Sequence, residues 1–291
     1  MRGTTLSITK AVIPAAGLGT RLLPITKEMP KEMLPIFTRG EHNEIFVKPL
    51  LQAVFEQLYS SNFAEFCFVI GRGKRTIEDH FTPDWGFVEY LLSKNKTKEA
   101  NELEAFYKKI QNSILMFVNQ PQPKGFGDAV LKAKAFTDGG TFLVHAGDDL
   151  ILSERTTYIK RLVDTFQTLE ADAAFLVEKV SDPTKYGVIK GEQIEEYLYH
   201  VSKIVEKPEV PPSNVAVIAV YVFKPEIYRQ LETVAPDKAG EIQLTSAIQG
   251  LIEDRDAVFA VELQEGEDRI DIGTTADYWT ALDITYGLNA Y

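Results

Sequence analysis

Short runs of β-branched and aromatic residues alternate with longer amphipathic runs through the first part of the chain. This alternation is typical of parallel strands joined by crossover helices, because a parallel pair needs a long connection. Two of the short runs, Phe66–Ile70 and Phe142–Ala146, are almost continuously apolar, as strands covered on both faces should be. The pattern predicts an α/β fold with a Rossmann-like, mixed and mostly parallel central sheet. We expect helices on both of its faces and these two strands at its centre.

The expected elements follow from these runs and their spacing. Strands are predicted at Lys10–Pro14, Phe66–Ile70, Ile114–Val118, Phe142–Ala146 and Ala173–Glu178. Helices are predicted at Val47–Tyr59, Gly125–Phe136 and Glu154–Leu169. After Lys179 the runs become short and extended, at Tyr186–Ile189, Ser202–Glu206 and Val215–Phe223, before helical segments resume at Glu241 and Thr275. We interpret this second part as a smaller antiparallel excursion from the sheet.

A charged segment rich in lysine and glutamate interrupts the alternation between residues 82 and 113. Its apolar residues recur with helical spacing, at Leu103, Phe106, Tyr107 and Ile110. The sequence contains no visible repeat, low-complexity tract or linker. We therefore expect one domain over residues 1–291 that carries a helical insertion at about 82–113.

The composition excludes several classes of protein. The longest apolar run, Val215–Phe223, has nine residues, far fewer than the roughly 20 that cross a bilayer. No basic segment followed by an apolar core and a cleavage site opens the chain, so a secretory signal is not expected. The single cysteine, Cys67, permits no intrachain disulfide and agrees with a reducing compartment. We expect a cytoplasmic protein without a membrane segment.

The charge distribution favours a small anionic ligand over nucleic acid. A net charge of −11 argues against a general nucleic-acid binder, which usually presents a basic surface to phosphates. Residues 1–35 nevertheless carry five cationic side chains against two acidic ones, a local balance of +3. These cations are Arg2, Lys10, Arg21, Lys27 and Lys31. A chance cluster on a solvated face is the alternative interpretation of charge alone.

The segment after the first predicted strand is a loop of small residues. Ala15, Ala16, Gly17 and Gly19 let the backbone approach a ligand and let successive N–H groups point at an anion. The loop lacks the third glycine of the dinucleotide fingerprint and the Gly-Lys-Ser/Thr of a P-loop, so neither NAD nor Walker-type ATP binding is supported. Arg21 and Lys31 follow instead. Two cations beyond such a loop suit a triphosphate.

The run Gly17-Leu-Gly-Thr-Arg-Leu-Leu-Pro24, combined with Pro30-Lys-Glu-Met-Leu-Pro35, resembles the signature of the sugar-nucleotide pyrophosphorylases. The second part is similar to the bacterial-type UTP-glucose-1-phosphate uridylyltransferases in particular, and the resemblance extends from Lys10 to about Tyr286. It implies a nucleotidyltransferase fold that joins UTP to glucose 1-phosphate and releases pyrophosphate. By the same resemblance Arg21 would hold the triphosphate and Lys31 would contact the reacting phosphates. Nucleotide contacts would come from Ala15, Ala16, Gly17, Gly19 and Thr20.

A second glycine-containing segment follows the predicted strand Ile114–Val118. Gln120 and Gly125 match the family positions that recognise the nucleobase, so the resemblance implies that they contact uracil. Glycine there permits a flat group to lie against the backbone. Without the first motif, an ordinary loop would be the simpler interpretation.

Two aspartates at the ends of strands are candidate metal ligands. Asp148 follows the buried strand Phe142–Ala146, where an α/β sheet binds its ligands, and carboxylates there suit a divalent cation. An acidic turn is the alternative interpretation. Family members hold Mg²⁺ with one aspartate from each of two places, and Asp148 and Asp271 match these positions. Asp149 is a less certain match.

The sugar phosphate has its own candidate segments, Tyr186-Gly-Val-Ile189, Val205-Glu-Lys-Pro208 and Glu241-Ile-Gln-Leu-Thr245. A glutamate accepts hydrogen bonds from vicinal hydroxyl groups, and a lysine neutralises an approaching phosphate. The resemblance assigns sugar-phosphate contacts to Gly187, Glu206, Lys207 and Asn214. Two departures from the family pattern are Ala219-Val220-Tyr221, where Gly-Arg-Tyr is common, and the polar insertion Thr38–Glu44.

The implied reaction has rivals that the sequence leaves open. Glucose-1-phosphate thymidylyltransferase would keep the chemistry with dTTP in place of UTP. A non-catalytic sugar-nucleotide sensor is a second alternative, because fold alone does not decide function. A glycosyltransferase that consumes sugar nucleotides is a distant third, since it lacks the Gly-Thr-Arg to Pro-Lys loop. The resemblance further implies a homo-oligomer, a dimer or tetramer.

Overall fold

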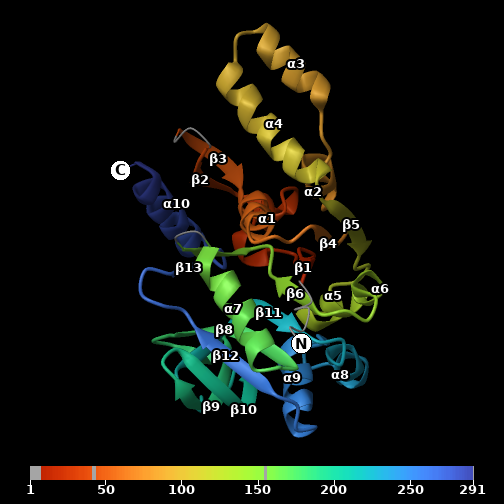
Figure 1. The fold of residues 1–291 in the computed structure, drawn as a ribbon, viewed down its shortest axis with the longest axis vertical. Coiled ribbons are helices and arrows are strands. Elements are labelled where there is room, and N and C mark those ends of the chain that lie inside the picture. The colour runs from red at the N-terminus through yellow and green to blue at the C-terminus, as the bar shows by residue number, and fades with distance from the viewer. Residues whose placement is uncertain (1–7, 41–43, 154–155, 291) are drawn as a thin grey trace, which may run out of the picture.

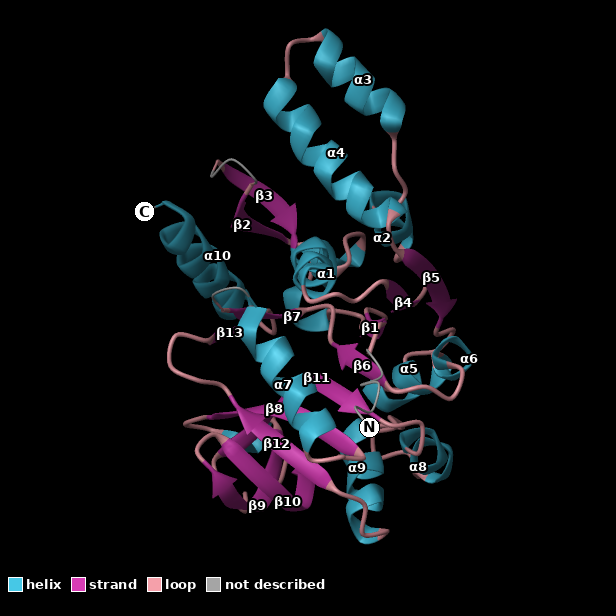
Figure 2. Cartoon of the chain, viewed as in Figure 1, coloured by secondary structure: helices cyan, strands magenta, loops and turns pink. Residues whose placement is uncertain are grey.

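A mixed sheet of nine strands runs through the middle of the protein (Figures 1 and 2). The computed structural model describes residues 8–40, 44–153 and 156–290. The strand order is β5-β4-β1-β6-β11-β8-β12-β10-β9. In chain order these strands are β1 (Lys10–Pro14), β4 (Glu65–Ile70), β5 (Ile114–Asn119), β6 (Phe142–His145), β8 (Ala173–Lys179), β9 (Gly187–Glu195), β10 (Leu198–Glu206), β11 (Val215–Phe223) and β12 (Val258–Glu262).

The strand directions make the sheet mixed. β5, β4, β1 and β6 are mutually parallel, β11 is antiparallel to both β6 and β8, and β12 is parallel to β8. β10 and β9 then add two antiparallel pairings. The expected antiparallel excursion is therefore part of the same sheet. β9 also pairs back to β11 through Val188 and Ala216, so this end of the sheet curls into a small barrel-like element.

Apolar side chains project from both faces of the sheet, which explains the continuous apolar runs. On β1, Ala11 and Ile13 belong to one buried cluster and Val12 to the other. Helices α1 (Leu50–Ser60) and α7 (Thr157–Thr168) cover the first face. The second face is covered by α5 (Phe126–Lys132), α8 (Ile227–Thr233) and α9 (Leu244–Glu253). This confirms helices on both faces.

One detail of the sheet differs from the prediction. β6 lies near its middle as expected, but β4 lies next to the edge strand β5. β4 is apolar because helices cover both of its faces, which does not require a central position.

Two helices occupy most of the charged segment 82–113. α3 (Trp85–Ser93) and α4 (Thr97–Gln111) form a pair that projects from the body, after the short helix α2 (Arg75–His80) (Figure 1). Phe106, Tyr107 and Ile110 are buried, whereas Leu103 is partly buried against the core. Lys48 ties this pair to the body, because its ammonium lies 3.0 Å from Glu56 on α1 and 2.5 Å from Glu102 on α4.

Several predicted helix boundaries were wrong. Val47–Pro49 belongs to strand β3 (Ile45–Pro49), which pairs with β2 (Pro35–Arg39), and α1 begins only at Leu50. The predicted helix Gly125–Phe136 divides into α5 and α6 (Lys134–Thr137), and the chain at Glu241 stays irregular until α9. Glu154 and Arg155 lie outside the described residues, as do Arg2 and positions 41–43 of the predicted insertion Thr38–Glu44.

Two smaller parts of the fold bear on the site, a short second sheet and the N-terminal loop. β7 (Asp149–Leu152) and β13 (Asp268–Asp271) form a two-stranded antiparallel sheet, and α10 (Thr275–Ala290) follows β13. The N-terminal loop contains three single turns of 3₁₀ helix, η1 (Thr20–Leu22), η2 (Ile25–Lys27) and η3 (Lys31–Met33). Within the described residues, no helix is both long and apolar enough to cross a membrane.

Candidate active site

A cavity of about 630 Å³ gathers most of the residues that the sequence singled out. Its walls come from the N-terminal loop, the β5–α5 loop, the β6–β7 turn, the segments around Gly187 and Glu206, the approach to α9, and the end of β13. The predicted residues that line it are Ala16, Gly17, Gly19, Thr20, Arg21, Lys31, Gln120, Gly125, Asp148, Gly187, Glu206, Lys207 and Asp271. Segments distant in the sequence therefore meet in one place.

Two predicted residues lie outside this lining. Ala15 is buried beneath the loop, and its N–H donates to the carbonyl of Val69 at 2.8 Å. Asn214 is exposed just before β11, and its carbonyl accepts from the N–H of Val180 at 3.0 Å. Ala15 thus supports the loop from below, and Asn214 stands away from the cavity.

The N-terminal loop is held open by a glycine in the left-handed region and by one hydrogen bond. Gly19 has φ 64°, a backbone conformation that residues other than glycine rarely adopt. The hydroxyl of Thr26 donates to the carbonyl of Gly19 at 2.7 Å. Lys31 then folds back under Gly17, where a Cβ would lie 3.5 Å from the Lys31 Cε. The loop and the lysine are consequently built as one unit.

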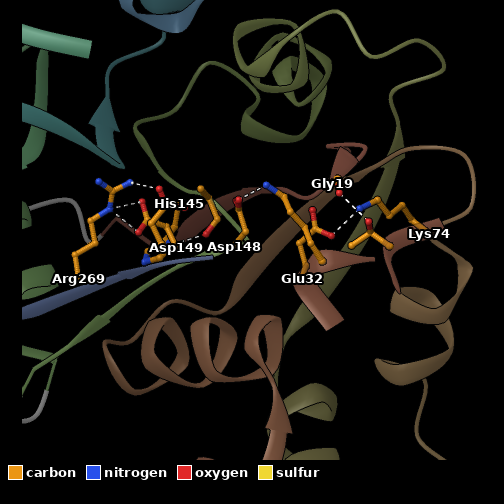
Figure 3. A network of polar contacts seen from close by, with 11 residues as sticks. Gly19, Glu32, Lys74, His145, Asp148, Asp149 and Arg269 are labelled. Atoms are coloured by element: carbon orange, nitrogen blue, oxygen red, sulfur yellow. Dashed lines mark hydrogen bonds and ion pairs between the residues drawn. The ribbon is translucent and has the colours of Figure 1, made fainter. Parts of the chain in front are cut away.

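Three ion pairs lie in a row along the site: Arg269 with Asp149, Lys31 with Asp148, and Lys74 with Glu32 (Figure 3). The Lys31 ammonium contacts a carboxylate oxygen of Asp148. Burial alone lowers the pKa of Lys31, but the charges of Asp148 and Glu32 outweigh it, so this pKa lies above its usual value. Glu32 is itself buried and pairs with Lys74 at 2.6 Å. Lys31 therefore stays cationic at neutral pH, with a buried ion pair beside it.

The small β7–β13 sheet brings Asp271 to the β6–β7 turn. Asp271 pairs with Asp149 in its register, and the N–H of Ile272 donates to the Asp148 carbonyl at 3.5 Å. The two candidate metal ligands thus reach the same cavity from segments that are distant in the sequence. The guanidinium of Arg269 lies beside them, with its Nε 2.8 Å and 3.1 Å from the two carboxylate oxygens of Asp149.

The donor set fits a magnesium ion. Burial and then the charge of Asp149 raise the pKa of Asp271 to about 6, which reflects carboxylates crowded together. A cation would relieve this repulsion. In the described ranges no three His, Cys, Asp or Glu side chains form a metal-binding group. Mg²⁺ is commonly held by one or two carboxylates together with substrate phosphates and water.

On the opposite side of the cavity, Gln120 is buried and fixed in place. Its amide nitrogen donates to the Gly125 carbonyl at 3.1 Å and to the Asp128 carboxylate at 2.8 Å. Gly125 precedes α5 with φ 93°, and a Cβ there would lie 2.9 Å from the Ile242 carbonyl oxygen. The glycine therefore also serves a close approach between two loops.

Gly127→Ala is expected to destabilise the protein, although alanine normally favours a helix. A Cβ at Gly127 would lie 2.7 Å from the backbone oxygen of Ile242, so the 241–242 segment would have to move. Overpacking of this kind costs about 1–3 kcal/mol. Gly287→Ala on α10 is the matched control, because an added methyl there meets nothing within 4 Å in the described chain and should stabilise slightly. Thermal unfolding of both variants tests this, and an unchanged or higher Tm for Gly127→Ala would contradict it.

The sugar-side residues interlock around another glycine. The Thr245 hydroxyl donates to Glu206 at 3.1 Å, and the Lys207 ammonium lies 3.4 Å from the other Glu206 oxygen. A Cβ at Gly187 would lie 2.9 Å from the Thr245 Cγ2, so only glycine lets these segments meet. The Lys207 side chain is 61% exposed and free to move toward an incoming anion.

Several residues in or beside the site received no role in the sequence analysis. Arg269 lies two positions before Asp271, but nothing in its local sequence shows that its guanidinium reaches three carboxylates. Lys74 pairs with Glu32 across the fold, a contact that no spacing rule predicts. Tyr221 lines the cavity and belongs to the segment Ala219-Val220-Tyr221, which departs from the family pattern. Only the alternation along β11 could have pointed to it, because Tyr221 shares a face with Val217.

Comparisons with known proteins identify the family of the chain. A family model described as nucleotidyl transferase matches residues 10–286. The UTP–glucose-1-phosphate uridylyltransferase of Streptococcus pneumoniae serotype 4 is 40% identical over 277 residues, which cover 92% of this chain and 87% of that protein. A crystal structure of UDP-glucose pyrophosphorylase complexed with UDP-glucose superposes with a TM-score of 0.84 at 34% identity, covering 97% of this chain and 100% of that one.

A UTP-bound UGPase from Acinetobacter baumannii superposes with a TM-score of 0.82 at 32% identity, covering 97% of this chain and 94% of that one. Both sequence and structure therefore match over nearly the whole length. The chain belongs to the nucleotidyl transferase family, and within it to the bacterial UTP–glucose-1-phosphate uridylyltransferases.

Proposed function

We propose that the protein transfers a uridylyl group from UTP to glucose 1-phosphate, giving UDP-glucose and pyrophosphate. The observation that carries this proposal is the meeting of Lys31, Asp148 and Asp271 at one wall of a cavity. The same cavity contains Gln120 on one side and Glu206 on the other. Relatives named for this reaction match the chain over nearly its full length.

The chemistry is a single in-line displacement. A phosphate oxygen of glucose 1-phosphate attacks the α-phosphorus of UTP, and pyrophosphate leaves from the opposite side. No protein nucleophile is required, so the protein acts by positioning the two anions and stabilising the charge that builds up between them. Arg21, Lys31 and Lys207 supply cationic side chains around the cavity for this task.

Asp148 and Asp271 are the residues that we propose to hold Mg²⁺. When bound, the ion would neutralise charge on the reacting phosphates and orient them. Lys31 contacts Asp148 in the structure, so a bound nucleotide phosphate would replace this carboxylate as its partner. The lysine is thereby already charged and close to the position where it is needed.

The remaining roles follow the walls of the cavity. We propose that Arg21 and the backbone of Ala16, Gly17, Gly19 and Thr20 bind the triphosphate, with Ala15 supporting the loop from below. Uracil would lie against Gln120 and Gly125. The sugar phosphate would contact Gly187, Glu206 and Lys207. A contact from Asn214 would require the 207–214 segment to move, because Asn214 stands outside the lining.

Nucleotide preference separates this function from its closest rival. We expect kcat/KM with UTP to exceed that with dTTP by about tenfold or more, because dTTP carries an additional base methyl group and lacks the ribose 2′-hydroxyl, and one methyl group alone changes binding in a shaped pocket by about that amount. The assay measures pyrophosphate release with glucose 1-phosphate and each nucleotide. Equal or faster turnover of dTTP would identify a thymidylyltransferase, and no release with either nucleotide would indicate a sugar-nucleotide sensor.

Assembly into a dimer or tetramer stays a prediction that light scattering tests.

A further inference from the structure

Arg269 makes more ionic contacts than the sequence suggested. It lies on β13, and its side chain is only 9% exposed. The Nε donates to both oxygens of Asp149, at 2.8 Å and 3.1 Å. The two terminal nitrogens donate to Glu178 at 2.9 Å and to Asp271 at 3.5 Å. One rigid, planar guanidinium thus joins three carboxylates from three different strands.

The same guanidinium also contacts the sugar side. Its central carbon lies 5.4 Å from the centre of the Tyr186 ring, within the range of a cation–π interaction. Tyr186 precedes Gly187, and its carbonyl accepts the N–H of Lys207 at 3.0 Å. Tyr186 is therefore next to two proposed sugar-phosphate contacts, Gly187 in sequence and Lys207 through this hydrogen bond.

These contacts connect parts of the fold that belong to different sheets. Asp149 and Asp271 are on the small β7–β13 sheet, whereas Glu178 is on β8 of the main sheet. Tyr186 lies in the connection that leads into β9. Arg269 therefore stands between the metal side and the sugar side of the cavity, and it lines that cavity itself.

We propose that Arg269 is a positioning residue that fixes Asp271 and the Tyr186–Gly187 segment relative to one another, an inference that rests on the proposed function. Without the guanidinium, the carboxylates of Asp149, Asp271 and Glu178 would repel one another and separate. The aspartate proposed to hold the metal and the segment proposed to hold the sugar phosphate would then no longer be fixed relative to one another. Displacements of about 1 Å at such sites lower rates strongly.

The test uses Arg269→Met and Arg269→Lys, with Mn²⁺ affinity measured by electron paramagnetic resonance in the absence of substrates. We expect Arg269→Met to weaken Mn²⁺ binding about 10- to 100-fold, the usual loss when a group that orients a metal ligand is removed. The KM for glucose 1-phosphate should rise about tenfold, and the KM for UTP should stay within about twofold. Arg269→Lys keeps the charge but not the planar fork. Its Mn²⁺ affinity should therefore return closer to the wild-type value than its KM for glucose 1-phosphate does.

Arg161→Met is the matched control, because Arg161 also pairs with a buried glutamate, Glu267, but lies outside the cavity lining. It should lower the Tm and leave Mn²⁺ affinity and both KM values unchanged. If folded Arg269→Met binds Mn²⁺ and glucose 1-phosphate like the wild type, the proposal is wrong. The same holds if Arg161→Met changes these values as much as Arg269→Met does.

Tyr186→Leu keeps the inference testable if Arg269→Met does not fold. This variant removes the ring contact but no charge, so the KM for glucose 1-phosphate should rise while Mn²⁺ affinity stays constant. An unchanged KM would overturn the proposed link between Arg269 and the sugar side. A failure of the proposed function would appear separately, as wild-type protein that forms no UDP-glucose, whereas the Mn²⁺ measurement needs no turnover.

Discussion

Lys31→Ala is expected to lower kcat for UDP-glucose formation by about 10²- to 10³-fold while the protein stays folded. The lysine is held at the cavity wall, and its ammonium remains charged because neighbouring carboxylates raise its pKa. Removing one pre-positioned donor from developing negative charge usually costs this much in turnover. Pyrophosphate release at saturating UTP and glucose 1-phosphate measures the effect.

Lys27→Ala is the control from the same loop. Lys27 is 77% exposed, pairs with Glu28 at 3.5 Å and does not line the cavity, so its kcat should stay within about twofold of the wild type. Turnover of Lys31→Ala close to that of Lys27→Ala would refute the role assigned to Lys31.

Asp148→Asn is expected to reduce turnover by a similar amount, about 10²- to 10³-fold, and to weaken metal binding. A metal ion contributes several kcal/mol to stabilising charge in such reactions, and each 1.36 kcal/mol is about tenfold in rate. The substitution also leaves Lys31 without its carboxylate partner. Activity measured against Mg²⁺ concentration should show a much higher requirement for the ion than in the wild type.

The surface variant Asp164→Asn provides the comparison. Asp164 lies on α7 and pairs with Lys160 in an exposed i,i+4 contact at 3.0 Å, so this variant should change neither rate nor Mg²⁺ requirement. An Asp148→Asn protein with the wild-type dependence on Mg²⁺ would show that this aspartate is not a ligand.

The strands were the most predictable part of the fold. β1 begins and ends at the predicted residues, Lys10 and Pro14, because an apolar run between polar and small residues has few alternatives. The hairpin β2–β3 was missed, since the apolar residues of Ile45–Pro49 run directly into α1 and continue its pattern. Pro49, which ends the strand, is the one residue that marks the boundary.

Pairings between distant segments could not be predicted from the sequence. β7 and β13 are four residues each, too short for a clear periodicity, yet they place Asp271 beside Asp148. The antiparallel direction of β11 next to β6 is likewise set by the whole path of the chain. Such contacts depend on tertiary packing, which overrides local preference.

The grouping of the site residues was predictable where one contiguous motif carries them. The loop from Ala16 to Lys31 is an example, since its small residues and cations have a single chemical use. Asn214 was harder, because its exposure depends on how the 207–214 turn is routed. The sequence suggested that glycine at position 125 lets a flat base lie against the backbone. The structure adds a second reason for glycine there, because the Ile242 carbonyl leaves no room for a Cβ.

The proposed function requires one cavity in which a cationic loop and two aspartates bind the same phosphates. A crystal structure of the protein with UDP-glucose and Mn²⁺, located by its anomalous scattering, tests it most directly. We predict one metal peak about 2.1 Å from a carboxylate oxygen of each of Asp148 and Asp271, with Lys31 on a phosphate oxygen and uracil against Gln120. A metal bound away from both aspartates, or a nucleotide seated outside this cavity, would contradict the account.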